Sequence, residues 1–161
     1  QIEVVVHPQS IIHALVGFSD GGIMAHLGPA DMRHAIGFAL HWPGRGMVPV
    51  ERLNLAQIGQ LNFEAPDSKR FPALRLAREV MDIRGLSGAA FNAAKEIALD
   101  CFMDRKLPFL AMAGVVEETL ARLSNQNSLG KAVSDLEDVL LMDHLARQTA
   151  GEVVRTWQQG S

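Results

Sequence analysis

The spacing of the apolar residues changes near residue 66, and this change constrains the fold of the 161-residue chain more than any other feature. Before it, short apolar runs rich in Val and Ile are separated by His, Pro, Gly and Asp, as is typical of strands and turns. After it, apolar residues recur three and four positions apart, as in amphipathic helices. The sequence therefore predicts an α+β chain with a strand-rich segment at 1–66 and an all-α domain at 67–161.

The strand-rich segment contains one strong hairpin signal. Asp20-Gly21 lies between two apolar runs, Ile11–Phe18 and Gly22–Leu27, and an Asp-Gly pair in this position favours a tight turn. We therefore predict a β-hairpin over 11–27. Both of its faces are largely apolar, so we expect helices or another subunit to cover at least one of them.

Two further elements are predicted on either side of the hairpin. Ile2–Val6 is rich in β-branched residues and predicts a strand that ends before Pro8, because proline has no amide hydrogen for a β-ladder. A short helix is expected after the hairpin, with Asp31 as its cap and Pro43 beyond its end.

The second half predicts four helices joined by short or polar connections. Gly85 stands where a left-handed helix end is expected, and Ser134 and Glu137 form the S-x-x-E pattern of a capping box. The short connections favour antiparallel neighbours in a four-helix bundle. The predicted helices are about Phe71–Met81, Ser87–Phe102, Phe109–Leu123 and Ser134–Trp157.

Charge and composition exclude several classes of function. The net charge of −3 and the pI near 6.1, without a Lys/Arg cluster, do not favour nucleic acid as a partner. Cys101 is the only cysteine, which leaves no disulfide framework and fits a reducing compartment. No stretch approaches about 18 uncharged apolar residues, and the first residues lack the pattern of an export signal. We therefore expect a cytoplasmic protein that does not enter a membrane.

Histidines and one serine are candidate functional residues. His7 and His13 could bind a metal, but no third ligand stands at a diagnostic spacing, so hydrogen-bonded structural histidines are the simpler interpretation. His34 and His41 are two helical turns apart, farther than the i, i+4 pair that zinc sites on helices use. Ser10 has no G-x-S-x-G context, so its residue pattern does not indicate a nucleophile.

Three segments carry a resemblance to a known family. IEVVVHPQSIIHALVGFSDGGIMAHLGPADMR contains HPQSxIH followed by LGxxDMR, and LNFEAPDSKRFPALRLA and FNAAKEIA follow in the same order. This series is similar to that of the 1-deoxy-D-xylulose 5-phosphate (DXP) reductoisomerases and extends over nearly the whole chain.

The resemblance implies roles for three residues at the rim of a substrate pocket. Ser10 and His13 would lie near the phosphate end of the substrate, where a hydroxyl and an imidazole supply hydrogen bonds directly or through water. Met32 would lie near the nicotinamide, where an apolar side chain helps to exclude water. The family's catalytic, metal-binding and cofactor-binding motifs would all precede Gln1.

The resemblance also implies the activity of a larger protein. The family's enzymes are homodimers that convert DXP to 2-C-methyl-D-erythritol 4-phosphate with NADPH and Mg²⁺ or Mn²⁺, a step of non-mevalonate isoprenoid biosynthesis. Residues 1–66, with the hairpin, would be the end of the catalytic and dimerisation domain, and 67–161 would be the C-terminal bundle. Because the NADPH-binding domain and the metal site would lie upstream, we expect the chain alone to be inactive. The alternative is a stand-alone helical binding or scaffolding module that has lost the reductase.

Overall fold

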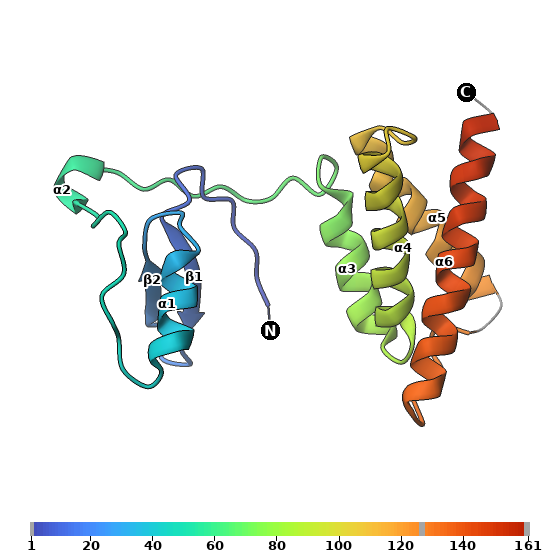
Figure 1. The fold of residues 1–161 in the computed structure, drawn as a ribbon, viewed down its shortest axis with the longest axis horizontal. Helices are drawn as coiled ribbons and strands as arrows, with labels where there is room; N and C mark the ends of the chain where they lie inside the picture. The colour runs from blue at the N-terminus through green and yellow to red at the C-terminus, as the bar shows by residue number, and fades with distance from the viewer. Residues whose placement is uncertain (1, 126–127, 160–161) are drawn as a thin grey trace. The chain divides into compact units, whose positions relative to one another are not determined.

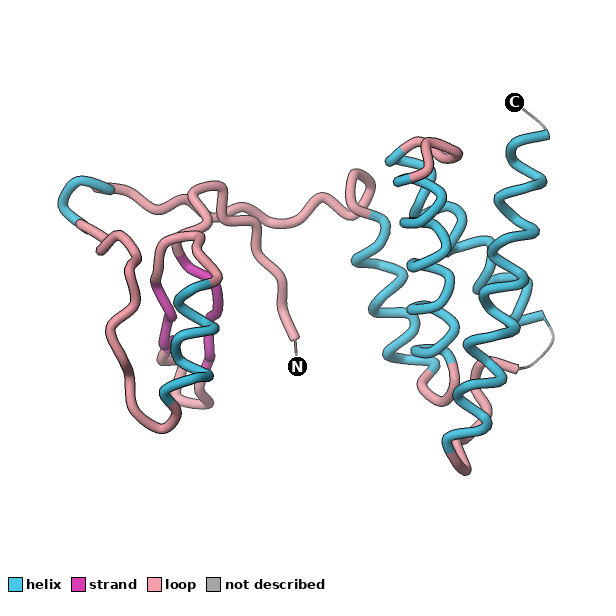
Figure 2. Tube along the Cα trace, in the orientation of Figure 1, coloured by secondary structure: helices cyan, strands magenta, loops and turns pink. Residues whose placement is uncertain are grey.

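The computed structural model describes residues 2–125 and 128–159, which divide into two compact units (Figure 1). Unit 1 comprises residues 1–66 and unit 2 comprises residues 67–161, so the division falls where the spacing of the apolar residues changes. Unit 1 combines a two-stranded sheet with two short helices and long loops, whereas unit 2 consists of helices and their connections (Figure 2). The predicted α+β class is confirmed.

The predicted hairpin forms in unit 1. Strand β1 (Ile12–Gly17) pairs antiparallel with β2 (Ile23–Leu27). Gly21 adopts a φ of +87°, which the turn requires, and the Asp20 carboxylate accepts a hydrogen bond from the Gly22 amide at 2.8 Å. The pairing shifts register between Ile12 and Ala14, so β1 contains a β-bulge there. The bulge interrupts the strict alternation of faces.

The predicted strand at residues 2–6 is wrong. Val6 alone forms an isolated antiparallel bridge with Glu64, through two backbone hydrogen bonds of 2.9 Å, while residues 2–5 are exposed. A strand requires a neighbour that satisfies its amides and carbonyls. Within the described part of unit 1, only the segment around Glu64 offers one, and it does so for a single residue.

Two helices complete unit 1. Helix α1 (Arg33–His41) follows Asp31, whose carboxylate accepts the Arg33 amide hydrogen at 2.9 Å, although the position directly before the helix is Met32. Helix α2 (Leu55–Ile58) was not predicted; the Asn54 side chain caps it by accepting the Gln57 amide hydrogen at 3.2 Å.

Four α-helices and one 3-10 turn build unit 2. Helix α4 packs against α3, α5 and α6, and α5 also packs against α3 and α6. Their small and aliphatic side chains form one core, in which Leu76, Leu123 and Val153 are fully buried. Ala90, Ala93, Ala94 and Ala98 allow α4 to lie close to its neighbours. The elements are α3 (Pro72–Ile83), α4 (Ser87–Met103), η1 (Phe109–Ala111), α5 (Met112–Asn125) and α6 (Leu136–Gln159).

The ends of these helices match the predictions in part. Gly85 has a φ of +57° as expected, although the preceding Arg84 shares the left-handed conformation at +62°. The capping box before α6 is shifted by one residue from the prediction. Asp135, not Ser134, accepts the amide hydrogen of Asp138, at 3.1 Å, and the Asp138 carboxylate accepts the Ser134 amide hydrogen at 3.0 Å.

No helix in the described ranges combines the length and apolar character that crossing a bilayer requires.

Candidate functional site

A cavity of about 620 Å³ lies in unit 1 beside the hairpin and the start of α1. Its lining brings together residues that are up to 32 positions apart in the sequence. The lining carries one guanidinium and three imidazoles beside a single carboxylate, so nitrogen groups that can hydrogen-bond to a ligand or its water predominate. The lining side chains with polar, sulfur or aromatic groups are His13, His26, Asp31, Met32, His34, Phe38 and Arg45.

His13 is held by backbone carbonyls at the far end of the hairpin. Its Nε2 lies 3.1 Å from the Gly28 oxygen and 3.2 Å from the Pro29 oxygen. A carbonyl oxygen only accepts hydrogen bonds, so Nε2 carries the hydrogen and donates it. Nδ1 is then the ring atom available to a ligand or a water. The His26 ring lies beside it, with the ring centroids 6.0 Å apart.

A tight ion pair stands at the entrance to α1. The Arg33 Nε atom lies 2.9 Å and 3.0 Å from the two Asp31 carboxylate oxygens. The side-chain hydrogen bond from Arg33, reinforced by the Arg33 amide, lowers the pKa of Asp31 from 3.8 to about 2. The carboxylate is therefore ionised and paired, and it adds little free negative charge to the cavity. Met32, between the two partners, is 71% exposed.

An aromatic and a guanidinium form another part of the cavity wall. The Arg45 guanidinium carbon lies 4.8 Å from the centroid of the Phe38 ring, in a cation–π arrangement. Phe38 also meets Trp42 edge to face, with centroids 5.6 Å apart. These contacts orient Arg45, whose charge is not paired by a salt bridge among the described residues.

The cavity unites two of the three predicted rim residues. His13 and Met32 both line it, whereas Ser10 does not. Ser10 lies two residues before β1, with a φ of +50°, and its amide donates a hydrogen bond to the His7 carbonyl at 3.0 Å.

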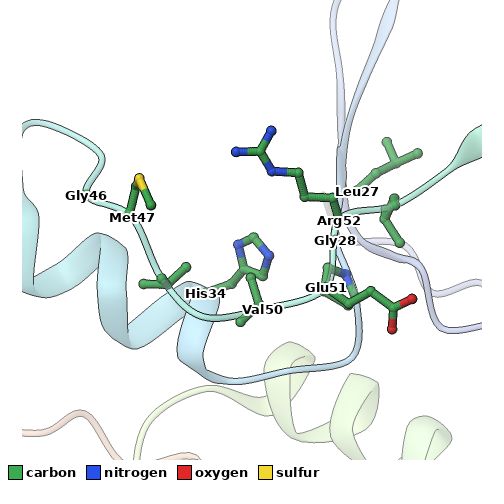
Figure 3. A pocket seen from close by; sticks show the side chains of 11 residues that line it. Leu27, Gly28, His34, Gly46, Met47, Val50, Glu51 and Arg52 are labelled. Carbon is green, nitrogen blue, oxygen red and sulfur yellow. The ribbon is translucent and has the colours of Figure 1, made fainter.

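A second cavity, of about 370 Å³, adjoins the loop after α1 (Figure 3). His34 lines both cavities. In Figure 3, the charged ends of Glu51 and Arg52 point in different directions. The two groups therefore do not converge on a common point, as an acid and a base acting together would.

Two of the histidines that the sequence analysis weighed as metal ligands and interpreted as structural make hydrogen bonds to backbone carbonyls. His7 Nδ1 lies 2.8 Å from the Asn62 carbonyl oxygen, and His41 Nδ1 lies 2.7 Å from the Gly37 carbonyl oxygen. Within residues 2–125 and 128–159, no three His, Cys, Asp or Glu side chains are arranged to hold a metal ion.

Sequence reasoning gave no pocket role to four lining side chains, His26, His34, Phe38 and Arg45, although it weighed His34 as a metal ligand. The four residues belong to no common motif. His26 could have been inferred from the hairpin, since the predicted pairing of 11–18 with 22–27 places it across from the residues near His13. For Arg45 we find no signal in the sequence.

Comparison with known proteins gives consistent matches. The family model described as "DXP reductoisomerase C-terminal domain" matches residues 27–149. The chain belongs to the DXP reductoisomerase family. It is 70% identical over 159 residues to the 1-deoxy-D-xylulose 5-phosphate reductoisomerase of a Cereibacter sphaeroides strain, which covers 99% of this chain and 40% of that protein. With the Ruegeria pomeroyi reductoisomerase it shares 62% identity over 148 residues, which cover 92% of this chain and 38% of that protein.

Solved reductoisomerase structures share the fold. The Zymomonas mobilis enzyme in complex with NADPH is 44% identical, with a TM-score of 0.81 over 94% of this chain and 39% of that chain. A DOX-P reductoisomerase in complex with NADPH, fosmidomycin and magnesium is 35% identical, with a TM-score of 0.87 over 98% of this chain and 40% of that chain. This member of the reductoisomerase family thus spans about two fifths of the length of the relatives it matches.

Proposed function

We propose that this chain is the C-terminal part of an NADPH-dependent reductoisomerase that converts DXP to 2-C-methyl-D-erythritol 4-phosphate in non-mevalonate isoprenoid biosynthesis. One observation carries the proposal: 99% of the chain aligns at 70% identity with a relative of that name. In this proposal, residues 1–66 end the catalytic domain. Helices α3 to α6 form the C-terminal four-helix bundle, which braces that domain.

The cavity in unit 1 is the proposed rim of the substrate pocket. Its support is the meeting of His13 and Met32 in one lining, with an excess of imidazole and guanidinium groups. His13 Nε2 is bonded to two carbonyls, so Nδ1 is an acceptor, proposed to meet the anionic group through a water that donates one hydrogen to Nδ1 and the other to the anion. Ser10, which lies outside the lining of this cavity, is proposed to add a hydroxyl from the turn before β1. Met32 contributes an exposed apolar surface that would exclude water from the reacting carbon.

NADPH and the divalent metal, Mg²⁺ or Mn²⁺, are proposed to bind the part of the polypeptide that precedes this chain. In this proposal the described residues carry out no metal-dependent step, and the isolated chain does not turn over substrate. The complete enzyme is proposed to be a cytoplasmic homodimer that associates through the apolar hairpin, where Val16 is 55% and Ile23 is 70% exposed.

The test uses the polypeptide encoded by the intact gene. It is purified beside the 161-residue chain, and both are given DXP, NADPH and Mg²⁺ while NADPH absorbance is followed. The proposal predicts oxidation of NADPH by the complete polypeptide only, with no oxidation when DXP is omitted. A gene that encodes only this chain, or a complete polypeptide without DXP-dependent oxidation, would contradict it and support the stand-alone module.

A further inference from the structure

The turn at residues 7–10 is fastened to a segment more than fifty positions away in the sequence. Val6 and Glu64 exchange two backbone hydrogen bonds of 2.9 Å, and the side chains of the turn then hold the neighbouring residue pair, 62–63. We name these contacts between His7, Gln9 and Asn62 the clamp. All of them lie within unit 1.

His7 forms one side of the clamp. Its Nδ1 donates to the Asn62 carbonyl oxygen at 2.8 Å, and its ring stacks on Phe63 with the centroids 4.9 Å apart and the planes inclined by 19°. Its Nε2 is buried, and no described residue offers it a hydrogen-bond partner. The ring is therefore committed to the clamp and not to the cavity.

Gln9 and Asn62 form the other side through a reciprocal pair. The Gln9 amide nitrogen donates to Asn62 Oδ1 at 3.2 Å, and Gln9 Oε1 accepts the Asn62 backbone hydrogen at 3.1 Å. Two hydrogen bonds between one pair of residues fix both distance and orientation, because a change in either breaks one of them. Gln9 thus forms hydrogen bonds with both the backbone and the side chain of Asn62.

The clamp lies directly before the residues of the proposed substrate rim. Ser10, next to Gln9, keeps a left-handed φ of +50°, which a non-glycine residue adopts at a cost that its surroundings must offset. The following carbonyl, of Ile11, accepts the Gly28 amide hydrogen at 3.0 Å, and the Gly28 carbonyl in turn accepts from His13. The position of the turn therefore affects Ser10 directly, as the next residue in the chain, and affects His13 through the hydrogen bonds of Ile11 and Gly28.

From this geometry we infer that Gln9 and Asn62, supported by His7, are positioning residues that hold Ser10 and His13 in place for the phosphate end of the substrate. The inference rests on the proposed function, because it acts through the rim roles of Ser10 and His13. It assigns a task to the Gln of the HPQS turn and to the Asn of LNFEAPD, two residues that the proposed substrate contacts leave unexplained.

The test measures steady-state kinetics of the complete polypeptide with Gln9→Ala, Asn62→Ala and the double variant. Loss of one hydrogen bond changes an equilibrium by about two- to tenfold, so we expect KM for DXP to rise by about that factor in each single variant. The double variant should raise it little further, because both changes break one pair. The kcat value and KM for NADPH should stay within about twofold, since the lost interaction orients groups that bind substrate.

Two variants serve as matched comparisons. Gln60→Ala removes the same amide from an exposed residue of the same segment whose side chain makes no hydrogen bond in the described structure, and it should leave KM for DXP unchanged. Asn62→Asp keeps an acceptor for the Gln9 amide, so it should restore most of the loss seen with Asn62→Ala. A merely structural role would not produce this selective rescue of KM for DXP.

Ser10→Ala and His13→Ala variants, measured in parallel, distinguish a failure of the clamp inference from a failure of the proposed substrate rim. If these raise KM for DXP while Gln9→Ala behaves like Gln60→Ala, the clamp inference is overturned and the proposed rim stands. If neither raises KM, the proposed rim itself fails, and the clamp inference fails with it. Should Gln9→Ala not yield folded enzyme, Gln9→Glu keeps the acceptor for the Asn62 amide and loses only the donor, and an unchanged KM for DXP in that variant overturns the inference.

Discussion

Gly114, in the first turn of α5, is expected to tolerate no larger side chain, because it lies against the ring of Trp157 on α6. A Cβ atom at Gly114 would lie 2.5 Å from the ring atom Cη2 of Trp157 and 3.3 Å from Cζ3. The ring cannot move away freely, since its Nε1 donates to the Glu118 carboxylate at 2.7 Å. Glu118 is also paired with Arg122, and its pKa is lowered chiefly by the Trp157 hydrogen bond. The ring is thus anchored at its edge.

The expected change in the free energy of unfolding on Gly114→Ala combines one stabilising and two destabilising effects. Replacing glycine by alanine inside a helix stabilises by about 0.8–1 kcal/mol through helix propensity. Overpacking costs about 1–3 kcal/mol, and losing a hydrogen bond to a charged group costs about 1.5–3 kcal/mol. For Gly114→Ala these figures together give a net loss of about 1.5–5 kcal/mol in the free energy of unfolding. Gly151 in α6 is the control, because a Cβ there meets nothing within 4 Å and only the propensity gain of about 1 kcal/mol remains.

Equilibrium urea unfolding, followed by far-ultraviolet circular dichroism, measures both variants against the parent chain. The helices of unit 2 dominate this signal, so the transition reports on the unit that contains both glycines. Similar stabilisation by Gly114→Ala and Gly151→Ala would refute the reasoning, since it would show that the Trp157 ring moves at no cost. In a Trp157→Leu background, Gly114→Ala should lose most of its destabilising effect, because the ring that the new methyl group meets is absent.

Three further predictions concern a helix cap, an ion pair and the hairpin. Asp135→Ala should lower the free energy of unfolding by about 1 kcal/mol, because the Asp135 carboxylate accepts the Asp138 amide hydrogen at the start of α6. The same urea experiment measures this variant, and an unchanged free energy of unfolding would contradict the role of Asp135 as the cap. The Asp31 carboxylate should titrate by NMR with a midpoint near pH 2, and Arg33→Ala should return it towards 3.8. Since folding lowers this pKa, the stabilisation by the pair is present above about pH 4 and is lost as the pH falls through 2. Val16→Lys in the complete polypeptide should weaken the proposed dimer and delay elution on a sizing column, and unchanged elution would count against the hairpin as the interface.

Local chemistry explains which elements the sequence predicts well. The hairpin follows from Asp20-Gly21, because the carboxylate and the left-handed glycine satisfy the turn within three residues. Gly85 likewise ends its helix region through its own conformation. The prediction of a strand at 2–6 is wrong because alternation and β-branching show only that a segment favours an extended conformation. A strand also needs a neighbouring segment to pair with, and local sequence does not identify that partner. The predicted capping residue is wrong by one position because Ser134 and Asp135 are both good caps, and local sequence does not decide which of them accepts the helix amide hydrogen.

The candidate site is harder to predict than the fold, because its residues come from segments that are far apart in the sequence. The meeting of His13 with Met32 was inferable only through family resemblance, since no periodicity joins a strand residue to the start of a later helix. The bulge near His13 shifts which side chains face the cavity, and a bulge leaves no reliable mark on alternation. The pairing of Gln9 with Asn62, 53 positions later, joins two polar residues that each look like ordinary loop positions.

The two units differ in how much apolar surface they bury, and this difference bears on the proposed function. Among the described residues, all buried apolar side chains lie in unit 2, between Leu76 and Val154, and the buried residues of unit 1 are glycines. Burial contributes about 25 cal/mol per Å², and ordering each residue costs about 1–2 kcal/mol, so unit 1 lacks the main term that would offset its own ordering. Its exposed residues include Ile23 at 70% and Trp42 at 71%. A stand-alone module would leave this surface in water, whereas the proposed complete reductoisomerase, with the proposed second subunit, offers further protein surface to cover it. The reductoisomerase therefore accounts for unit 1 better than the stand-alone module does.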